Sequence, residues 1–218
     1  MSNKNAILDT ITKDVASLTN VDAVEYLSSI IDDLIDMRRG CNVKTTNNSF
    51  EISKKTVIRK FLKDVSELPK HNKAVLKNSL GKETTESNIG LERLWYKKSD
   101  YGISSKNERL WILVARIFIF LGGEFENLTK ESAMDFSTAF AKSTTSNSSQ
   151  ERFDLLTHTS MNSYRAFESN LLTCVRIVKS KGYKFNCVNL LYDLLQWKDR
   201  DNKVQSKWSN NFYTTLNN

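Results

Sequence analysis

The apolar residues of this chain recur at steps of three and four over several long segments. The clearest of these segments runs through Tyr164, Phe167, Leu171, Val175 and Val178. At this spacing the five side chains fall on one side of a helix and give that helix a face to bury. The pattern therefore predicts a long amphipathic helix, and the glycine that follows at position 182 predicts its end, since glycine readily adopts a left-handed conformation.

Two more helices are predicted after this one. Residues 188–197 form a short and strongly apolar segment, and the polar run KDRDN separates that segment from the last helix. The inward positions of the last helix are expected to be Val204, Trp208, Phe212 and Leu216. The C-terminal part of the chain is therefore expected to be a small helical bundle.

The upstream sequence predicts further helices over residues 5–18, 21–39, 53–68, 70–82, 90–98, 108–123 and 129–142. The polar residues 40–50 are expected to form a loop, and Pro69 is expected to end the helix before it. Residues 108–123 are apolar nearly all round, which is typical of a central helix. With one proline and seven glycines in 218 residues, the chain is predicted to be all-α.

A run of serine, threonine and asparagine, STTSNSSQ, occupies residues 143–150. Such a composition is typical of a linker. We therefore expect an N-terminal helical bundle over residues 1–142, a linker over 143–150 and a C-terminal helical bundle over 151–218.

The net charge of +7 is unevenly distributed. Residues 1–50 carry five Lys or Arg against seven Asp or Glu, so the basic excess belongs to the later helices. An excess of this kind suits a polyanionic partner such as nucleic acid, although it can also serve solubility alone. No segment combines a bare basic face with exposed aromatic residues, so a membrane partner is not expected.

The sequence also indicates where the protein acts. Its three cysteines are odd in number and lack metal-ligand spacing, which favours a reducing compartment. The N-terminus has no apolar core of a signal peptide, and no run of about 18 apolar residues occurs. We therefore expect a cytoplasmic protein.

Several cations share helix faces and are the candidate nucleic-acid contacts. One row lies on the predicted helix after Pro69, a second group lies opposite the apolar face of the long helix, and a pair lies on the last helix. In chain order these candidates are Lys70, Lys73, Lys77, Arg165, Arg176, Lys179, Lys203 and Lys207.

Other basic and aromatic residues are expected to have different roles. Arg109 and Arg116 lie seven residues apart in the central helix, and we expect them to be paired structural arginines because a buried charge needs a partner. Arg93 is less constrained and can reach nucleic acid. The four tryptophans could stack on unpaired bases, but their core-like spacing predicts that all are buried: Trp95, Trp111, Trp197 and Trp208.

The sequence offers little catalytic chemistry. His71 and His158 are far apart and lack further ligands at metal spacing, and no phosphate-binding glycine loop is found. The glycine pair after residue 121 is expected to end a helix. We therefore predict no cofactor and no metal site.

One acidic group is the exception, because neighbouring carboxylates can hold Mg²⁺ for phosphodiester cleavage. It comprises Glu25, Asp32, Asp33 and Asp36. A solvated helix face explains these residues better, since no base or nucleophile accompanies them. A Mg²⁺-dependent nuclease therefore remains an alternative.

The C-terminal part also resembles a known family. Its order of motifs is RF at residue 152, DLL, RIVKSKG, NLLYDLLQW and finally V-x-x-x-W-x-x-x-FY. This order is similar to that of the CasB family, the small subunit of Cascade, the type I-E CRISPR RNA-guided surveillance complex. Weaker similarity through NKAVLKNSLGK, GLERLWY and ERLWILVARIFIFLG extends the match to roughly residues 21–213.

The resemblance implies an all-helical, non-catalytic subunit of an antiviral complex. Such a subunit would contact the other Cascade proteins, the CRISPR guide RNA, the target DNA and a second copy of itself, and would help to hold the displaced DNA strand. By position, Lys73 matches the first basic residue of the family's R-x-x-L element. Arg152 matches the family's RF, and Arg176 and Lys179 match the basic residues before the helix-ending glycine.

The chain departs from the family pattern at several places. Leu172, Gln205 and Asn210 stand where many relatives have arginine, and Asn78 and Ser79 interrupt the basic run after residue 76. Nearby cations at positions 165, 203 and 207 are expected to substitute. A helical protein-interaction adaptor, whose charge serves solubility, is the remaining alternative function.

Overall fold

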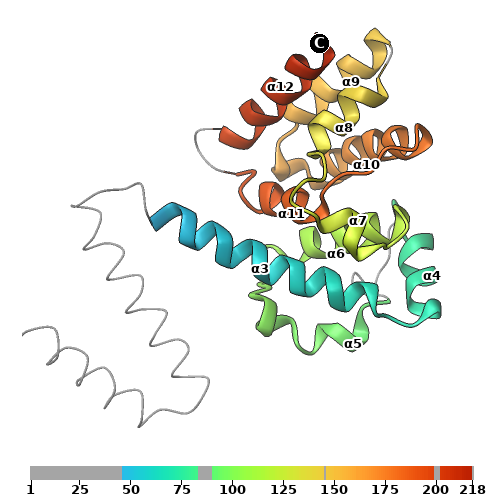
Figure 1. Ribbon diagram of the computed structural model, residues 1–218. Helices are drawn as coiled ribbons and strands as arrows, with labels where there is room; N and C mark the ends of the chain where they lie inside the picture. The colour runs from blue at the N-terminus through green and yellow to red at the C-terminus, as the bar shows by residue number, and fades with distance from the viewer. Residues whose placement is uncertain (1–45, 83–89, 145, 199–201, 218) are drawn as a thin grey trace, which may run out of the picture. The chain divides into compact units, whose positions relative to one another are not determined.

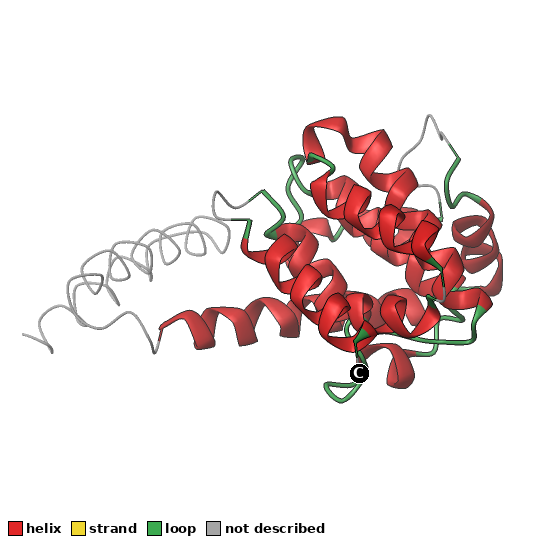
Figure 2. Cartoon of the chain, turned by 90° about the horizontal axis from the view of Figure 1, so that it is seen from above, coloured by secondary structure: helices red, strands yellow, loops and turns green. Residues whose placement is uncertain are grey.

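The computed structural model describes residues 46–82, 90–144, 146–198 and 202–217, and every regular element in these ranges is a helix (Figures 1 and 2). The all-α prediction is confirmed. The α-helices are α3 (Thr46–Ser66), α4 (Lys70–Asn78), α5 (Glu92–Trp95), α6 (Glu108–Phe120), α7 (Phe125–Thr129), α8 (Phe136–Ser143), α9 (Asn147–His158), α10 (Tyr164–Ser180), α11 (Cys187–Leu195) and α12 (Lys203–Leu216). Two short 3₁₀ helices, η1 (Lys98–Tyr101) and η2 (Met161–Ser163), complete the set.

Helix α6 is the centre of the compact unit that runs from Ser53 to Asn218. Every residue from Leu110 to Ile119 is buried, as its apolar sequence predicts. Helices α4, α10 and α11 all pack against it. Helix α3 reaches the same core, because the ring of Phe61 meets the ring of Trp111 edge-on at 5.0 Å. Because α6 must be buried on all sides, α4 and α10 lie packed against it.

Aromatic rings fill the second part of the core, among α8, α9, α10 and α12. Phe153 of α9 stacks on Phe212 of α12 at 4.2 Å, and Phe140 of α8 stacks on both rings. Trp208 packs against Phe136 and Trp197 at 4.9 Å each. The predicted inward face of α12 is therefore confirmed for its three main positions, and all four tryptophans are buried as predicted.

Asn186 joins the segment after α7 to the start of α11. Its side-chain oxygen accepts hydrogen bonds from the first free amides of α11, those of Val188 and Asn189, and so caps that helix. Its own amide groups donate to the carbonyls of Lys130 and Met134. Residues 130–135, between α7 and α8, form turns and irregular backbone instead of a helix. The single helix predicted over residues 129–142 is therefore wrong, and α8 begins only at Phe136.

Two predicted loops are shorter in the structure. Helix α3 begins at Thr46, inside the predicted loop of residues 40–50, because a polar sequence does not by itself prevent a helical turn. Within the predicted linker 143–150, Ser143 is the buried last residue of α8 and α9 begins at Asn147. The compact unit Ser53–Asn218 lies on both sides of that segment. The helices predicted over residues 5–18 and 21–39 lie outside the described residues.

A buried carboxylate ties α11 to α12. Asp193 accepts a hydrogen bond from the indole of Trp208 at 2.7 Å and pairs with the ammonium of Lys207 at 3.0 Å. Burial raises the pKa of Asp193 above its ordinary value, and the charge of Lys207 opposes this shift. The pair therefore keeps a charged group inside a helical interface.

Replacing Phe153 by alanine tests the aromatic stack. We expect Phe153→Ala to lower the free energy of unfolding by about 3–5 kcal/mol, because it leaves a cavity between two stacked rings. Urea unfolding followed by circular dichroism measures the change. Leu155→Ala is the matched control, because Leu155 lies on the same helix and is 57% exposed, so its loss should cost no more than about 0.5 kcal/mol. Equal losses in the two variants would contradict the packing described.

Replacing Lys207 tests the buried pair. Because the folded-state pKa of Asp193 is raised, its carboxyl favours folding below the unfolded pKa, and this contribution is lost as pH rises through the folded pKa. Lys207→Ala should raise that pKa further and lower the unfolding free energy by about 1–3 kcal/mol at neutral pH.

The cost of Lys207→Ala should shrink as the pH falls through the raised folded-state pKa of Asp193, because a protonated carboxyl no longer pairs with the ammonium. Unfolding measured across pH 4–8 checks this, with Lys142→Ala as an exposed control on α8. A cost that does not change with pH would contradict the ion pair.

Candidate nucleic-acid interface

Helix α4 presents a row of three lysines. At 100° per residue, Lys70, Lys73 and Lys77 fall within a sector of about 60°. Leu76 is the buried residue of this helix, which packs on α6. The packing of α4 on α6 therefore leaves the lysine row directed away from that contact, with Lys70 and Lys77 exposed and Lys73 half-buried.

Arg176 of α10 lies beside the C-terminal end of α4. A Cβ atom placed on Gly81 would come within 2.9 Å of the Arg176 guanidinium and 3.4 Å of the Leu172 side chain. The backbone of Gly81 has φ of +75°, a conformation that favours glycine. The turn after α4 therefore passes directly over α10, which brings the cations of the two helices together. The only trace of this contact in the sequence is the glycine itself, which falls inside the helix predicted over residues 70–82, whereas α4 ends at Asn78.

Lys179 of α10 lies on the last residue of α6. Its ammonium donates a hydrogen bond to the carbonyl of Phe120 and sits 3.7 Å from the centre of that ring. The cation thus satisfies a free carbonyl at the end of a helix, where positive charge is favoured. Burial lowers the pKa of Lys179, and the nearby positive charge of Lys77 lowers it further. Lys77 is thus near enough to Lys179 for its charge to act on that ammonium.

We define the basic patch as Lys73, Lys77, Arg176 and Lys179. Two of the four come from α4 and two from α10, and each pair is spaced to share one helix face. Cations that are close together repel one another, so the patch gains from any anion that binds between them. Arg176 offers a planar fork of donors suited to a phosphate, whereas the lysines act as point charges. The arrangement can therefore bind neighbouring phosphates of one strand.

The other predicted contacts are more scattered. Arg152 is exposed on α9 and Arg165 is exposed near the start of α10. Arg165 is eleven residues from Arg176, about 16 Å along the helix. Lys203 is exposed in the first turn of α12, and Lys207 is held by Asp193. The structure thus brings together Arg176, Lys179 and the α4 row, and it gives Lys207 a structural partner.

The two arginines of the central helix α6, Arg109 and Arg116, interact with side chains of α10. Arg116 is only 5% exposed, and the nearest opposite charge that acts on it is that of Glu168 on α10. Burial lowers the pKa of Arg116 and raises the pKa of Glu168, and the attraction between the two groups opposes both shifts. Arg109 lies over the ring of Tyr164 at 5.5 Å, and its charge also acts on Glu168. Arg116 is therefore buried as expected, whereas Arg109 is exposed, and the structural pairing of Arg109 stays a prediction.

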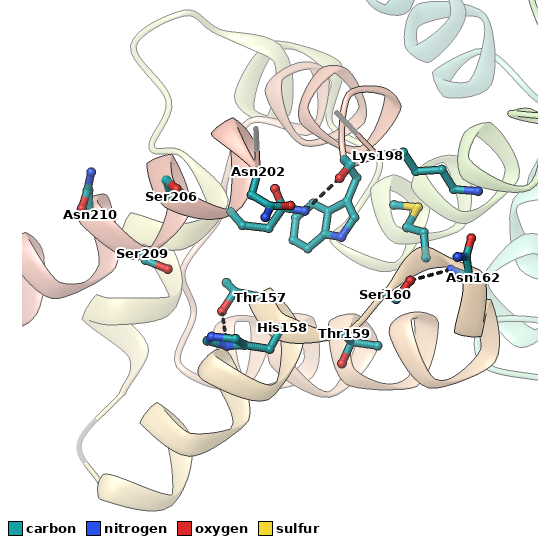
Figure 3. A pocket seen from close by; sticks show the side chains of 13 residues that line it. Thr157, His158, Thr159, Ser160, Asn162, Lys198, Asn202, Ser206, Ser209 and Asn210 are labelled. Atoms are coloured by element: carbon teal, nitrogen blue, oxygen red, sulfur yellow. Dashed lines mark hydrogen bonds between the residues drawn. The ribbon is translucent and has the colours of Figure 1, made fainter. Parts of the chain in front are cut away.

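A polar pocket of about 810 Å³ lies between the C-terminal end of α9 and the N-terminal half of α12 (Figure 3). Hydroxyl and amide side chains dominate its wall, and the figure shows Thr157 and Thr159 opposite Ser206 and Ser209. Gln205 and Asn210 also line it, at positions where the family resemblance led us to expect arginine. Lys198 is the one lysine in this wall, which contains no arginine. This pocket is therefore much less basic than the patch on α4 and α10.

Metal and membrane sites have no counterpart among the described residues. No group of three or more His, Cys, Asp or Glu side chains in that part of the chain is placed to hold a metal ion. Over the same ranges, no helix has both the length and the hydrophobicity needed to cross a bilayer. The acidic group of the nuclease alternative, Glu25, Asp32, Asp33 and Asp36, lies outside the described residues.

Comparison with solved structures supports the fold. A CRISPR-associated protein of the Cse2 family from Thermus thermophilus matches with a TM-score of 0.60 at 19% identity, over 73% of this chain and 97% of that one. CasB from Thermobifida fusca matches with a TM-score of 0.52 at 16% identity, over 73% and 97% of the two chains. A chain described as "CRISPR RNA-guided surveillance complex" matches with a TM-score of 0.56 at 14% identity, over 75% and 95%.

Comparison of the sequence with families assigns the chain. No curated protein sequence matches it significantly. The family described as CRISPR-associated protein Cse2 matches residues 72–213, a range that runs from α4 to α12 and contains the whole basic patch. Because this match covers well over half of the sequence, the chain belongs to the CRISPR-associated Cse2 family, which confirms the resemblance to CasB.

Proposed function

We propose that this protein is the non-catalytic small subunit of an RNA-guided CRISPR surveillance complex of the Cascade type. Its partners would be the other protein subunits, the guide RNA with its target DNA, and a second copy of itself. Its task would be to clamp nucleic acid, including the displaced DNA strand, by its phosphates. The observation that carries this proposal is the basic patch, set within a domain of the Cse2 family.

Membership of the family supports a place in the complex. One of the matched folds is that of a chain described as "CRISPR RNA-guided surveillance complex". That chain is covered over 95% of its length, so nearly all of its fold has a counterpart here. A subunit of this kind is held in place by its neighbours and does not need high affinity for nucleic acid by itself.

The chemistry of the patch supports binding without sequence preference. Lysine and arginine that neutralise phosphates release condensed counterions, and this gain does not depend on the bases. Contacts to phosphates set the position of a strand, whereas contacts to base edges read its sequence. All four members of the patch are cations, and two of them, Lys77 and Arg176, are exposed. The patch therefore suits a clamp on a strand that other parts of a complex have selected.

Lys77 and Arg176 are the best residues for a test, because Lys179 also stabilises the end of α6. Binding of single-stranded DNA should weaken with salt, with a log–log slope of about −3 if four phosphates are neutralised. The double variant Lys77→Ala, Arg176→Ala should have a slope of about −1.5, because each lost phosphate contact makes the slope less negative by about 0.7. Fluorescence anisotropy over a series of salt concentrations measures both slopes.

The control is Lys106→Ala, Lys142→Ala, which removes the same charge from two exposed lysines outside the patch. It should keep the slope of the wild type. Equal slopes for all three proteins would contradict the proposed patch. The same samples incubated with Mg²⁺ test the nuclease alternative, and appearance of cleaved strand would contradict the non-catalytic role.

A further inference from the structure

The side chain of Tyr96, at the end of α5, is 71% exposed, although tyrosine is usually at least partly buried. Leu155 and Tyr213 are the other large apolar side chains that are exposed among the described residues, and they belong to α9 and α12. Tyr213 donates its hydroxyl to Asp154 at 2.7 Å, whereas the Tyr96 hydroxyl has no such partner among the described residues. Tyr96 is therefore the most exposed aromatic residue in the described part of the chain.

Two cations flank this ring. Arg93 and Lys97 stand three residues before Tyr96 and one residue after it, and both are exposed. The Lys97 ammonium lies 5.7 Å from the centre of the Tyr96 ring. Exposed aromatic rings beside cations are the combination that single-strand-binding proteins use, with bases stacked on the rings and the backbone held by the charges.

The ring also borders a pocket of about 270 Å³, which Arg93 and Lys97 line as well. This volume lies just below the roughly 300–1,000 Å³ of pockets that hold drug-sized ligands, and it suits a smaller planar group. Leu68, Pro69 and Leu94 give the pocket an apolar part. These features match the needs of one unstacked base.

Two carboxylates in the wall of this pocket determine which part of a nucleotide can enter it. Asp64 and Glu67 line the same pocket, and Asp64 accepts a hydrogen bond from Tyr101 at 2.5 Å. Their negative charge repels a phosphate but does not repel a neutral base, whose amino groups can donate to a carboxylate. The base would therefore lie in the pocket, and its phosphate would remain at the side of Arg93 and Lys97.

The pocket is close in the chain to the lysine row. Leu68 and Pro69 in its wall directly precede Lys70, the first residue of α4 (Figure 1). Helix α4 is nine residues long, about 13 Å, and the turn that follows it meets Arg176 of the basic patch at Gly81. A strand can therefore follow the row from the Tyr96 pocket to the basic patch.

We propose that Tyr96, with Arg93 and Lys97, forms a stacking site for one unpaired nucleotide of the strand whose phosphates bind along α4. This inference rests on the proposed function, because it uses the same strand. It assigns the protein a contact with a base face as well as with phosphates. Stacking of this kind is tolerant of sequence, since every base has a face that can stack.

The test compares two strands of equal length and charge, an oligodeoxycytidine and a strand of abasic deoxyribose phosphates. Wild type should bind the first more tightly. Tyr96→Ala should weaken binding to the first strand by roughly 5- to 100-fold, the range expected for loss of one stacked base. The same variant should leave binding to the abasic strand and the salt slope unchanged.

Matched variants separate stacking from damage to the fold. Tyr96→Phe should bind like wild type, because it keeps the ring, and Tyr213→Ala removes an exposed tyrosine elsewhere without affecting strand preference. Melting temperatures confirm that each variant is folded. If Tyr96→Ala binds both strands as wild type does, or weakens both equally, the stacking site is overturned.

The two proposals fail in different ways. Wild type that binds neither strand at low salt would overturn the phosphate clamp and the stacking site that depends on it. Wild type that binds the abasic strand and the natural strand equally well would overturn the stacking site alone. If wild type binds the oligodeoxycytidine more tightly than the abasic strand, and Tyr96→Ala loses this difference, both proposals are supported.

Discussion

The need to cover an almost wholly apolar helix determines the arrangement of the described unit. Residues 110–119 of α6 are all buried, so the helix must have neighbours on every side. Burial of this much apolar surface is the dominant favourable contribution to folding. Helices α4, α10 and α11 supply the cover with their own apolar faces. The residues that α4 and α10 leave exposed include Lys70, Lys77, Arg165 and Arg176.

The position of the basic patch is thus a consequence of the core. Repulsion among Lys77, Lys179 and Arg176 costs stability, and only the packing of two helices on a third keeps these residues together. Lys179 offsets part of this cost by bonding to the carbonyl of Phe120 at the end of α6. A phosphate between the cations would offset more. The proposed phosphate site would therefore be formed before any anion binds.

Much of this could be predicted from the sequence, because periodicity reports directly on helix faces. The inward residues of α10 and α12, the burial of the tryptophans and the glycine stop after α10 all follow from spacing. Periodicity does not report on contacts between distant segments. The bonds from Asn186 to residues 130 and 134 therefore had no sequence signal. A glycine at position 81 was the only trace of the approach of Arg176.

The sequence shows on which face of a helix a lysine or arginine lies. It does not show which other residue that side chain contacts. Lys203 and Lys207 share a helix with the same spacing as the lysines of α4, yet Lys207 is held by Asp193 on the preceding helix. The exposure of Tyr96 depends on tertiary packing, although Arg93 and Lys97 around it are a readable signal. Gln205 and Asn210, at positions where the resemblance predicted arginine, line a polar pocket.

The central claim is that one strand lies along α4 and reaches α10. Lysine footprinting tests it most directly: the protein is acetylated with and without single-stranded DNA, and modification at each lysine is quantified by mass spectrometry. The account predicts protection at Lys70, Lys73 and Lys77, and unchanged modification at the exposed residues Lys106 and Lys142. Protection that is uniform over all exposed lysines, or absent from α4, would contradict it.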